Sequence, residues 1–184
     1  VISGLNPQPG QNFIDGTVGG GGHALAILQA TGPHGRLLAF DRDQGALLAA
    51  RENLAQFGNR VIFIHDSYSN LVNYVERNKF SPVNGILFDL GLSSAQLDDG
   101  DRGFSFKNIG PLDLRFNTNV GPSAAELLNN ESEAELVRIF KEYGEEPQAG
   151  KLARTIVAER RLHPFQTTTD LLTVVEKVKG SGRR

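Results

Sequence analysis

The sequence predicts an α/β protein in which a doubly wound parallel sheet is followed by an all-helical region. Three observations support this prediction. In the first half of the chain, short apolar runs alternate with amphipathic ones, as in βαβ units. Four consecutive glycines, at residues 19–22, separate the first apolar run from the first amphipathic one. Beyond a long polar stretch only helical patterns follow, so we expect one domain in residues 1–97 and a second in residues 98–184.

Four short apolar runs are the expected strands. Each is apolar on both sides, which favours burial on both faces of a sheet, as parallel sheets require. The amphipathic runs between them are the expected helices, and glycine closes the first two. The strands are expected at residues 12–15, 36–41, 61–65 and 85–90, and the helices at 23–32, 44–57 and 70–78.

The polar stretch after Gly91 has neither a helical nor a strand period, so we expect a long irregular loop there. Only helices are expected beyond it. Residues 123–126 and 132–135 both read Ser-x-x-Glu, the spacing of a capping box at the start of a helix. A third helix is expected within residues 147–164, bounded by two prolines, and a last one from residue 169.

The fourth expected strand would lie at an edge of the sheet with its backbone unpaired, which proteins usually avoid. Together with the absence of methionine, this indicates that the chain is part of a longer protein. We therefore expect the chain alone to expose apolar surface and to bind its ligand weakly.

The composition is that of a globular chain, with 39% hydrophobic and 22% charged residues among 184. Without cysteine the chain has neither disulfides nor thiolate metal sites, which favours a cytoplasmic location. We expect no metal site of any kind, and no apolar run is long enough to cross a membrane.

Polar residues gather where the expected strands end. Asp15 lies at the end of the first strand and Asp89 at the end of the fourth. Asp41 and Asp43 lie at the end of the second strand, and His65 and Asp66 at the end of the third. In open α/β sheets, ligands bind beyond the carboxyl ends of the strands. Each carboxylate has an alternative role as the N-cap of the next helix. Their convergence on one edge of the sheet favours a ligand site.

The run of four glycines lies between a strand and a helix, where bare backbone amides can contact a ligand. Asp41 follows the run by about 20 residues, the position at which such folds bind the hydroxyls of a ribose. An adenosine-containing cofactor is therefore expected. Gly19, Gly21 and Ala24 also fit the fingerprint of dinucleotide-binding loops, so NAD stays open. However, Asp15 would face a pyrophosphate with a like charge, and the sulfonium cation of S-adenosyl-L-methionine fits this edge better.

Four segments of the chain read DGTVGGGGHA, AFDRD, GILFDLGLSSAQLDD and DGDRGFSFKNIGPLDLRF. They resemble the bacterial small-subunit ribosomal RNA (cytosine-N(4))-methyltransferase family, and the resemblance covers essentially the whole chain. It is most specific from residue 89 to residue 115. The resemblance implies a Rossmann-like class I methyltransferase fold with an inserted helical domain, S-adenosyl-L-methionine as the cofactor and small-subunit ribosomal RNA as the substrate.

The resemblance also implies which residues bind the cofactor. The positions that match are Gly21, Gly22, His23, Asp41, Tyr68, Asp89 and Gln96. Tyr68 stands where the family commonly has Phe, and its planar ring is suited to stacking on adenine. His23 has the alternative role of an ordinary residue in the first turn of a helix.

The cytosine amine is a poor nucleophile because its lone pair is delocalised into the ring. A hydrogen-bond acceptor beside the amine would restore electron density to nitrogen, and the protein would otherwise act by positioning. Asp89, Ser93 and Ser94 are the catalytic candidates at the end of the fourth strand. The Pro-Pro-aromatic motif that is usual at this point in amino-methyltransferases is absent.

The loop beside the expected site has aromatic and arginine residues that suit a base taken out of its stack. These candidate RNA-binding residues are Arg102, Phe104, Phe106 and Arg115. In the alternative interpretation, the two phenylalanines pack the loop onto the helical domain and an arginine forms a salt bridge.

Basic residues concentrate at the end of the chain, where residues 150–184 have eight basic and three acidic side chains. Such a segment is either a solvated helix face or a surface for a polyanion. The candidates for contacts with RNA phosphates are Lys151, Arg154, Arg160 and Arg161.

Three functions therefore compete: an RNA methyltransferase, an NAD-dependent oxidoreductase, and a non-catalytic RNA-binding assembly factor with the same fold. The expected partner is the RNA of the small ribosomal subunit, and a homodimer is left open. No membrane partner is expected.

Overall fold

The computed structural model describes residues 1–107 and 109–180 of the chain. The chain divides into two compact units, Val1–Gly91 and Leu92–Arg184, which we call unit 1 and unit 2 and describe separately. The predicted boundary between residues 97 and 98 lies shortly after this division.

Unit 1 contains a sheet of four parallel strands in the order β3-β2-β1-β4. In the two pairs that β1 forms, Phe13 lies opposite Leu37 of β2 and opposite Gly85 of β4. The strands are β1 (Phe13–Asp15), β2 (Leu37–Asp41), β3 (Val61–His65) and β4 (Gly85–Leu87). The prediction of a parallel sheet with crossover helices is confirmed.

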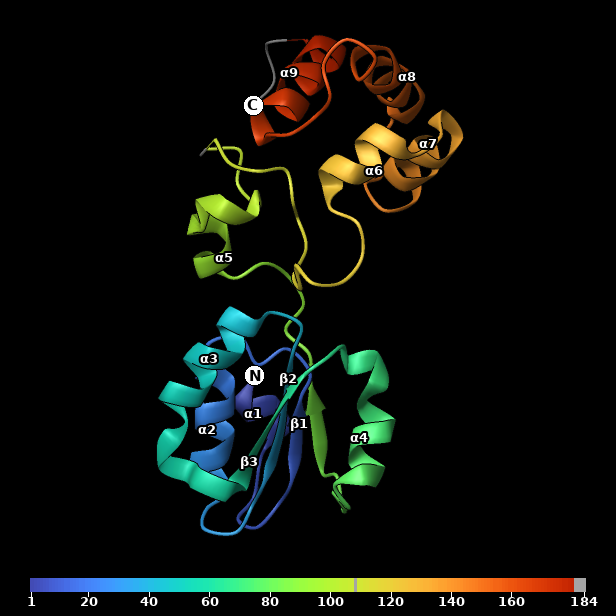
Figure 1. Cartoon of the computed structure of the whole chain (residues 1–184). Helices are drawn as coiled ribbons and strands as arrows, with labels where there is room; N and C mark the ends of the chain where they lie inside the picture. Colours follow the sequence, from blue (N-terminus) through green and yellow to red (C-terminus); the bar gives the residue numbers. More distant parts are fainter. Residues whose placement is uncertain (108, 181–184) are drawn as a thin grey trace. The chain divides into compact units, whose positions relative to one another are not determined.

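Helices cover both faces of this sheet, with α2 and α3 on one face and α4 on the other (Figure 1). The core between the sheet and helices α2 and α3 includes Phe13, Leu28 and Leu37. The core between the sheet and α4 includes Ile14 and Phe40. All five side chains are buried, which explains why the strands are apolar on both faces. The helices and 3₁₀ turns of unit 1 are α1 (Ile2–Leu5), α2 (Gly22–Ala30), α3 (Gln44–Asn53), η1 (Ala55–Arg60), η2 (Tyr68–Asn70) and α4 (Leu71–Arg77).

Two predicted elements of unit 1 are longer than the structure allows. The helix expected at 44–57 ends at Asn53, and the 3₁₀ turn η1 follows it. The fourth strand was expected to reach residue 90 but ends at Leu87. Shortly after that point the Asp89 amide donates to the side chain of Thr17 and not to a strand backbone, so the ladder stops.

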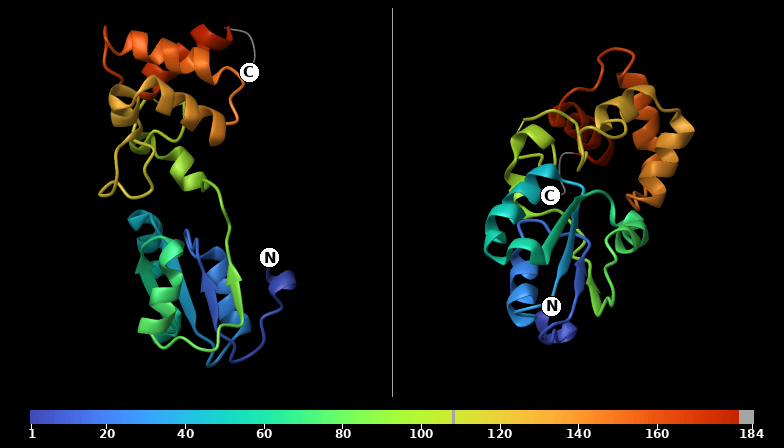
Figure 2. Two further views of the ribbon diagram at one scale, coloured as in Figure 1. Left: turned by 90° about the vertical axis from the view of Figure 1, so that its right-hand side faces the viewer. Right: turned by 60° about the horizontal axis from the view of Figure 1, so that its bottom comes forward.

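Unit 2 is helical, and both views of Figure 2 show α6 to α9 gathered together. Their core includes Leu136, Ile156 and Val174, all buried. The elements of unit 2 are α5 (Ser94–Asp98), η3 (Gly100–Arg102), α6 (Ala124–Asn130), α7 (Glu133–Glu142), α8 (Ala149–Glu159) and α9 (Thr168–Lys179). Within residues 1–107 and 109–180, no helix has the length and apolar character needed to cross a membrane.

The stretch after Gly91 is not wholly irregular, because α5 and η3 lie within it. Helix α5 is too short for a helical period to show in the sequence. Its start is held by a capping box in which Ser93 accepts from the Gln96 amide and the Gln96 side chain accepts from the Ser93 amide.

The capping box predicted at residues 123–126 is complete and begins α6. The one predicted at 132–135 is only half formed. Ser132 accepts from the Glu135 amide, but the Glu135 carboxylate pairs with Arg138 one turn further along α7 and so does not return to the cap.

Candidate functional site

Carboxylates meet at the edge of the sheet where β1, β2 and β4 end. Asp15 is the last residue of β1, Asp41 is the last residue of β2, and Asp89 follows β4. Burial is the main cause that raises the pKa of Asp15, and the nearby charges of Asp41 and Asp89 raise it further. We call this edge of unit 1, with the loop between β1 and α2, the acidic rim.

The glycine loop presents bare backbone to the acidic rim. Gly21 precedes α2 with φ 87°, and Gly19 has φ 52°, so both adopt a left-handed conformation that other residues rarely adopt. No side chain caps the start of α2. A Cβ added at Gly19, Gly20 or Gly22 would meet open space, so these glycines leave room at the backbone for a ligand.

Asp41 holds the glycine loop in place. Its two carboxylate oxygens accept hydrogen bonds from the Gly19 amide and from the Asp43 amide, each at 2.9 Å. Each carboxylate oxygen has a second lone pair for a ligand hydroxyl. The predicted role of Asp41 in binding a ribose therefore stays a prediction, and the structure adds that Asp41 supports the loop.

Asp15 is a buried carboxylate at the floor of the acidic rim, with 1% of its surface exposed. It accepts a hydrogen bond from the Thr17 amide at 3.1 Å. Burial raises the pKa of Asp15 from an ordinary 3.8 to about 6, against the lowering effects of that hydrogen bond and of the positive charge of His23. At neutral pH the charged form is present and destabilised, so a cation bound here would relieve it.

Thr17 links the glycine loop to the segment after β4. Its Oγ1 accepts a hydrogen bond from the Asp89 amide at 2.7 Å, although 72 positions separate the two residues. His23 Nε2 lies 3.4 Å from Asp89 Oδ2, and both side chains are substantially exposed. The predicted cofactor residues His23 and Asp89 are thus brought together, whereas Thr17 was not identified from the sequence.

Tyr68 lies at the same end of the sheet and forms an edge-to-face pair with Phe88, with ring centroids 4.9 Å apart. The Phe88 ring rests on Gly16, where an added Cβ would collide with it. About two fifths of each aromatic residue is exposed, so the Tyr68 ring is accessible to a planar ligand. Its predicted contact with adenine stays a prediction, and Phe88 was not identified from the sequence.

Two other polar residues at the strand ends stabilise the fold locally. His65 Nε2 lies 3.0 Å from the Arg42 carbonyl. Asp66 accepts from the backbone amide of Ser67, from the side-chain amide of Asn70 and from the Tyr74 hydroxyl. Against partial desolvation, these bonds lower the pKa of Asp66. The partners of Asp66 are thus local, but Asp66 is not the N-cap of the next helix, because Ser67 caps η2 and Asn70 precedes α4.

The remaining candidates at the active site, Ser93, Ser94 and Gln96, belong to unit 2 and begin α5. Ser93 and Gln96 bond to each other in the capping box, which gives both a structural role. Ser94 is exposed. Their predicted catalytic and cofactor-binding roles stay predictions.

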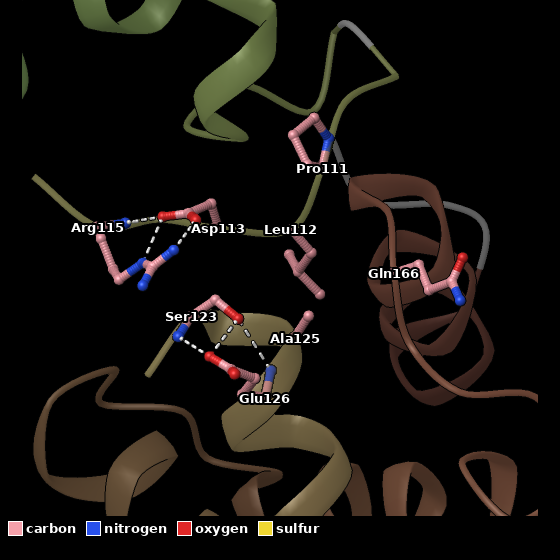
Figure 3. A pocket seen from close by; sticks show the side chains of 8 residues that line it. All are labelled: Pro111, Leu112, Asp113, Arg115, Ser123, Ala125, Glu126 and Gln166. Carbon is pink, nitrogen blue, oxygen red and sulfur yellow. Dashed lines mark hydrogen bonds and ion pairs between the residues drawn. The ribbon is translucent and has the colours of Figure 1, made fainter. Parts of the chain in front are cut away.

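The arginines of the following loop mostly stabilise the loop itself. Arg102 Nη2 donates to the carbonyls of Arg115 and Phe116, at 2.7 and 2.8 Å, and its guanidinium lies 5.5 Å from the centre of the Phe104 ring. Arg115 forms a two-pronged ion pair with Asp113. Phe104 packs against Phe116, with ring centroids 5.4 Å apart. The ion pair of Arg115 matches the alternative of a salt-bridged arginine (Figure 3). The packing of both phenylalanines onto the helical domain is not seen, because Phe104 contacts Phe116 of the same loop and Phe106 is exposed.

Phe106 differs from the rest of this loop, since 75% of its surface is exposed. Among the predicted aromatic candidates it is the one whose ring is open to a base. Its predicted role in RNA binding stays a prediction.

Two of the four basic candidates at the end of the chain bond to backbone carbonyls within unit 2. Lys151 donates to the Val178 carbonyl at 3.0 Å, and Arg160 donates to the carbonyls of Leu128 and Glu131 at 2.8 and 2.7 Å. The other two, Arg154 and Arg161, bond to no backbone carbonyl among the described residues and are exposed, as Lys151 also is. Arg154 lies 3.6 Å from Glu133. Arg154 and Arg161 are therefore better placed than Lys151 and Arg160 to contact phosphates.

Metal coordination finds no support in the part of the chain that the structure describes. There, no three His, Asp or Glu residues come together in a group that could hold an ion.

The comparisons with known proteins agree on one protein family. The model of the MraW methylase family matches residues 1–184. The chain is 48% identical over 179 residues to ribosomal RNA small subunit methyltransferase H of Thermomicrobium roseum, covering 97% of the chain and 55% of that protein. It is 47% identical over 182 residues to the protein of the same name from Syntrophotalea carbinolica, covering 99% of the chain and 58% of that protein.

The chain thus spans about half the length of the curated relatives it matches. Among solved structures, a candidate rRNA methylase from Clostridium thermocellum matches with a TM-score of 0.44 and 22% identity, over 57% of this chain and 63% of that one.

Proposed function

Because the chain belongs to the MraW methylase family, we propose that it is part of an S-adenosyl-L-methionine-dependent enzyme that methylates the exocyclic amine of a cytidine in small-subunit ribosomal RNA. The observation that carries this proposal is the acidic rim, in which the buried Asp15 lies beneath a glycine loop held by Asp41. The relatives' name supplies the substrate class.

The charges of the acidic rim favour a cationic cofactor. Asp15, Asp41 and Asp89 are all carboxylates, and the one nearby basic side chain that acts on Asp15 is His23. A sulfonium would relieve the unfavourable charge on Asp15, whereas the pyrophosphate of NAD would add to it. When bound, S-adenosyl-L-methionine supplies a methyl group on a positively charged sulfur. Gly21, Gly22, His23, Asp41, Tyr68, Asp89 and Gln96 would hold it.

The protein's contribution to the reaction is orientation and charge. The cytosine amine needs an acceptor that draws on an N–H bond so that electron density returns to nitrogen. Asp89 suits this role because its carboxylate is 67% exposed and its backbone is fixed by the Thr17 hydroxyl. The imidazole of His23, 3.4 Å away, would orient the Asp89 carboxylate.

RNA is the proposed partner, and the exposed side chains of Phe106, Arg154 and Arg161 would contact it. A homodimer stays a prediction, and so does a location in the cytoplasm. A non-catalytic assembly factor would bind RNA without binding the cofactor, which separates it from the proposed enzyme.

The test is methyl incorporation from labelled S-adenosyl-L-methionine into small ribosomal subunits, by this chain and by a protein extended to the length of its relatives. We expect incorporation by the longer protein and little by the chain alone, in which Ile86 of β4 and Phe88 just after it are each 42% exposed.

The Asp89→Asn variant of the longer protein keeps the shape of the side chain but loses its charge. We expect it to lower the rate by about a hundredfold, the scale of a lost proton acceptor. Asp66→Asn, a carboxylate after β3 with local partners, is the matched control and should keep the rate. No incorporation by the longer protein would exclude the proposed function.

A further inference from the structure

The glycine loop of unit 1 has few neighbours that hold its shape. A Cβ added at Gly19, Gly20 or Gly22 would meet open space, so little of the surrounding protein packs against these positions. Glycine also has more conformational freedom to lose on folding than any other residue. Hydrogen bonds to the backbone of the loop are therefore what keeps it in the conformation that the structure shows.

Two backbone hydrogen bonds hold the middle of the loop. The Val18 amide donates to the Phe40 carbonyl at 2.8 Å, which ties the loop to β2. The Gly21 amide donates to the Val18 carbonyl at 2.8 Å, which closes a tight turn over residues 18–21. The Gly20 carbonyl lies within this turn, and no backbone amide among the described residues donates to it.

Asn53 supplies the partner of that carbonyl. Its side-chain Nδ2 donates to the Gly20 carbonyl at 3.0 Å, although 33 positions separate the two residues. Asn53 is the last residue of α3 and is exposed. The end of α3 also packs beside the loop, because a Cβ added at Gly21 would lie 3.3 Å from the Leu54 side chain and 3.5 Å from the Ala50 Cα. The end of α3 thus supports the glycine loop.

The bond from Asn53 fixes the direction of a whole peptide unit. The carbonyl of Gly20 and the amide of Gly21 belong to one planar unit and point in opposite directions. Asn53 holds the carbonyl and Val18 holds the amide, so this unit does not rotate. Without Asn53, the two glycines leave it free to turn, since glycine adopts either sign of φ.

The amides left for a ligand depend on this arrangement. The amides of Gly20 and Gly22 donate to no acceptor found among the described residues, so both are available. Their directions follow from the peptide units beside them. If the loop sampled several conformations, a ligand would select the one that it fits, and the affinity would fall in proportion to the population of that conformation.

We propose that Asn53 is a positioning residue of the cofactor site, which keeps the glycine loop in the conformation that S-adenosyl-L-methionine fits. Asn53 acts through the Gly20 carbonyl and not by contact with the cofactor. The inference rests on the proposed function, because it takes the acidic rim and the glycine loop as the cofactor site.

The test is calorimetric titration of the chain with S-adenosyl-L-methionine, compared with Asn53→Ala and Asn53→Leu. Both variants remove the amide donor, and Leu keeps the branched shape of Asn. We expect the affinity to fall by about three- to tenfold in both, the range for one hydrogen bond between neutral groups. Gln56→Ala is the matched control, because it removes an exposed side-chain amide of η1 that forms no hydrogen bond among the described residues. It should keep the affinity of the wild type.

The melting temperature separates positioning from stability. Ala and Leu favour a helix more than Asn does, which offsets the lost hydrogen bond at the end of α3. Both variants without ligand should therefore melt within about 4 °C of the wild type. A larger loss of stability in both would give Asn53 a structural role only and overturn the inference.

A second ligand tests how Asn53 acts. S-adenosyl-L-homocysteine, the product of methyl transfer, lacks the positive charge of the sulfonium. Because Asn53 is uncharged and acts through the shape of the loop, the affinity for this product should fall by the same factor. A loss confined to S-adenosyl-L-methionine would contradict this action through the loop.

The inference and the proposed function fail in different ways. If the wild type binds S-adenosyl-L-methionine and both Asn53 variants bind it equally well, the role of Asn53 is removed and the proposed function stands. If the folded wild type binds neither ligand, the proposed function is contradicted, and the inference that rests on it fails as well.

Discussion

The two units differ in what their charged residues bind. In unit 1, the carboxylates of the acidic rim contact backbone amides and His23, and no Lys or Arg pairs with Asp15, Asp41 or Asp89 among the described residues. In unit 2, the arginines and lysines that the sequence suggested for RNA mostly bond to carboxylates and carbonyls of the same unit. Unit 1 therefore retains charge for a ligand, whereas unit 2 uses most of its charge to hold its loops and helix ends.

This difference shows in which part of the molecule sequence patterns predict the role of a charged residue. The carboxyl ends of parallel strands meet at one edge, so polar residues that follow the strands are brought together by the topology itself. No comparable rule brings polar residues together in a helical region. A basic residue on a helix faces either solvent or the end of a neighbouring helix, and its position along the chain does not tell which.

The largest expected effect tests the charge at the floor of the acidic rim. Because folded Asp15 keeps its proton up to a pH of about 6, the free energy of unfolding should fall as the pH rises from about 4 to about 6 and then level off. Asp15→Asn should remove this dependence and stabilise the chain at pH 7.5 by up to about 3 kcal/mol. Urea unfolding of both proteins across this pH range would measure it.

The same variant should also weaken binding of S-adenosyl-L-methionine, since the charge that favours a sulfonium is lost. A gain in stability together with a loss of affinity would mark Asp15 as a ligand-binding group. If Asp15→Asn is less stable than the wild type at pH 7.5, the buried charge is not the destabilising feature that we describe.

The next prediction tests whether basic residues of unit 2 stabilise its fold. Arg160 donates to two backbone carbonyls, so Arg160→Ala should lower the free energy of unfolding by about 1.5–3 kcal/mol. Its neighbour Arg161 is exposed, and Arg161→Ala should change the stability by less than about 0.5 kcal/mol. Equal effects of the two substitutions would contradict the assignment. Thermal unfolding monitored by circular dichroism compares them directly.

A smaller effect is expected for the link between the glycine loop and the segment after β4. Thr17→Val keeps the shape of the side chain but removes the acceptor for the Asp89 amide, which should weaken cofactor binding by about 1 kcal/mol, or roughly fivefold. Thr17→Ser retains the hydroxyl and should bind normally. Calorimetry on the three proteins tests this, and equal affinities would show that Thr17 does not position Asp89.

The smallest effect concerns RNA binding by the exposed basic residues. Replacing both Arg154 and Arg161 by Ala should reduce the salt dependence of RNA binding by up to about two units, about one for each phosphate that the protein no longer neutralises. Lys151→Ala should leave the slope unchanged, because Lys151 is engaged by the Val178 carbonyl. A larger change for Lys151 than for the pair would reverse our ranking of these residues.

Much of unit 1 follows from the sequence because local rules and topology agree there. The apolar runs gave strands whose ends lie within a few residues of the prediction, and the glycine run lies between β1 and α2 as expected. The contact between Thr17 and Asp89 was missed because it joins residues 72 positions apart, and no local pattern marks it. The pairing of Tyr68 with Phe88 was missed because no local pattern marks it either.

Unit 2 was predicted in outline only. Its helices follow from caps and apolar spacing, but α5 is too short to produce a period. The bonds of Arg102 and Arg160 to carbonyls depend on where helices end in space, since a carbonyl is present at every residue and leaves no mark in the sequence. For this reason the sequence does not tell which basic residues of unit 2 are held by backbone carbonyls, and the roles proposed in RNA binding stay predictions.

The central claim is that the acidic rim of unit 1 binds S-adenosyl-L-methionine and that Asp41 is part of the site. Calorimetric titration of the chain with S-adenosyl-L-methionine, and separately with NADH, tests it most directly, together with Asp41→Ala and the control Asp66→Ala. We predict weak but saturable binding of S-adenosyl-L-methionine only, weakened in Asp41→Ala by about 1.5–3 kcal/mol and unchanged in Asp66→Ala. Binding of NADH, or an affinity for S-adenosyl-L-methionine that is the same in a folded Asp41→Ala variant, would contradict the account.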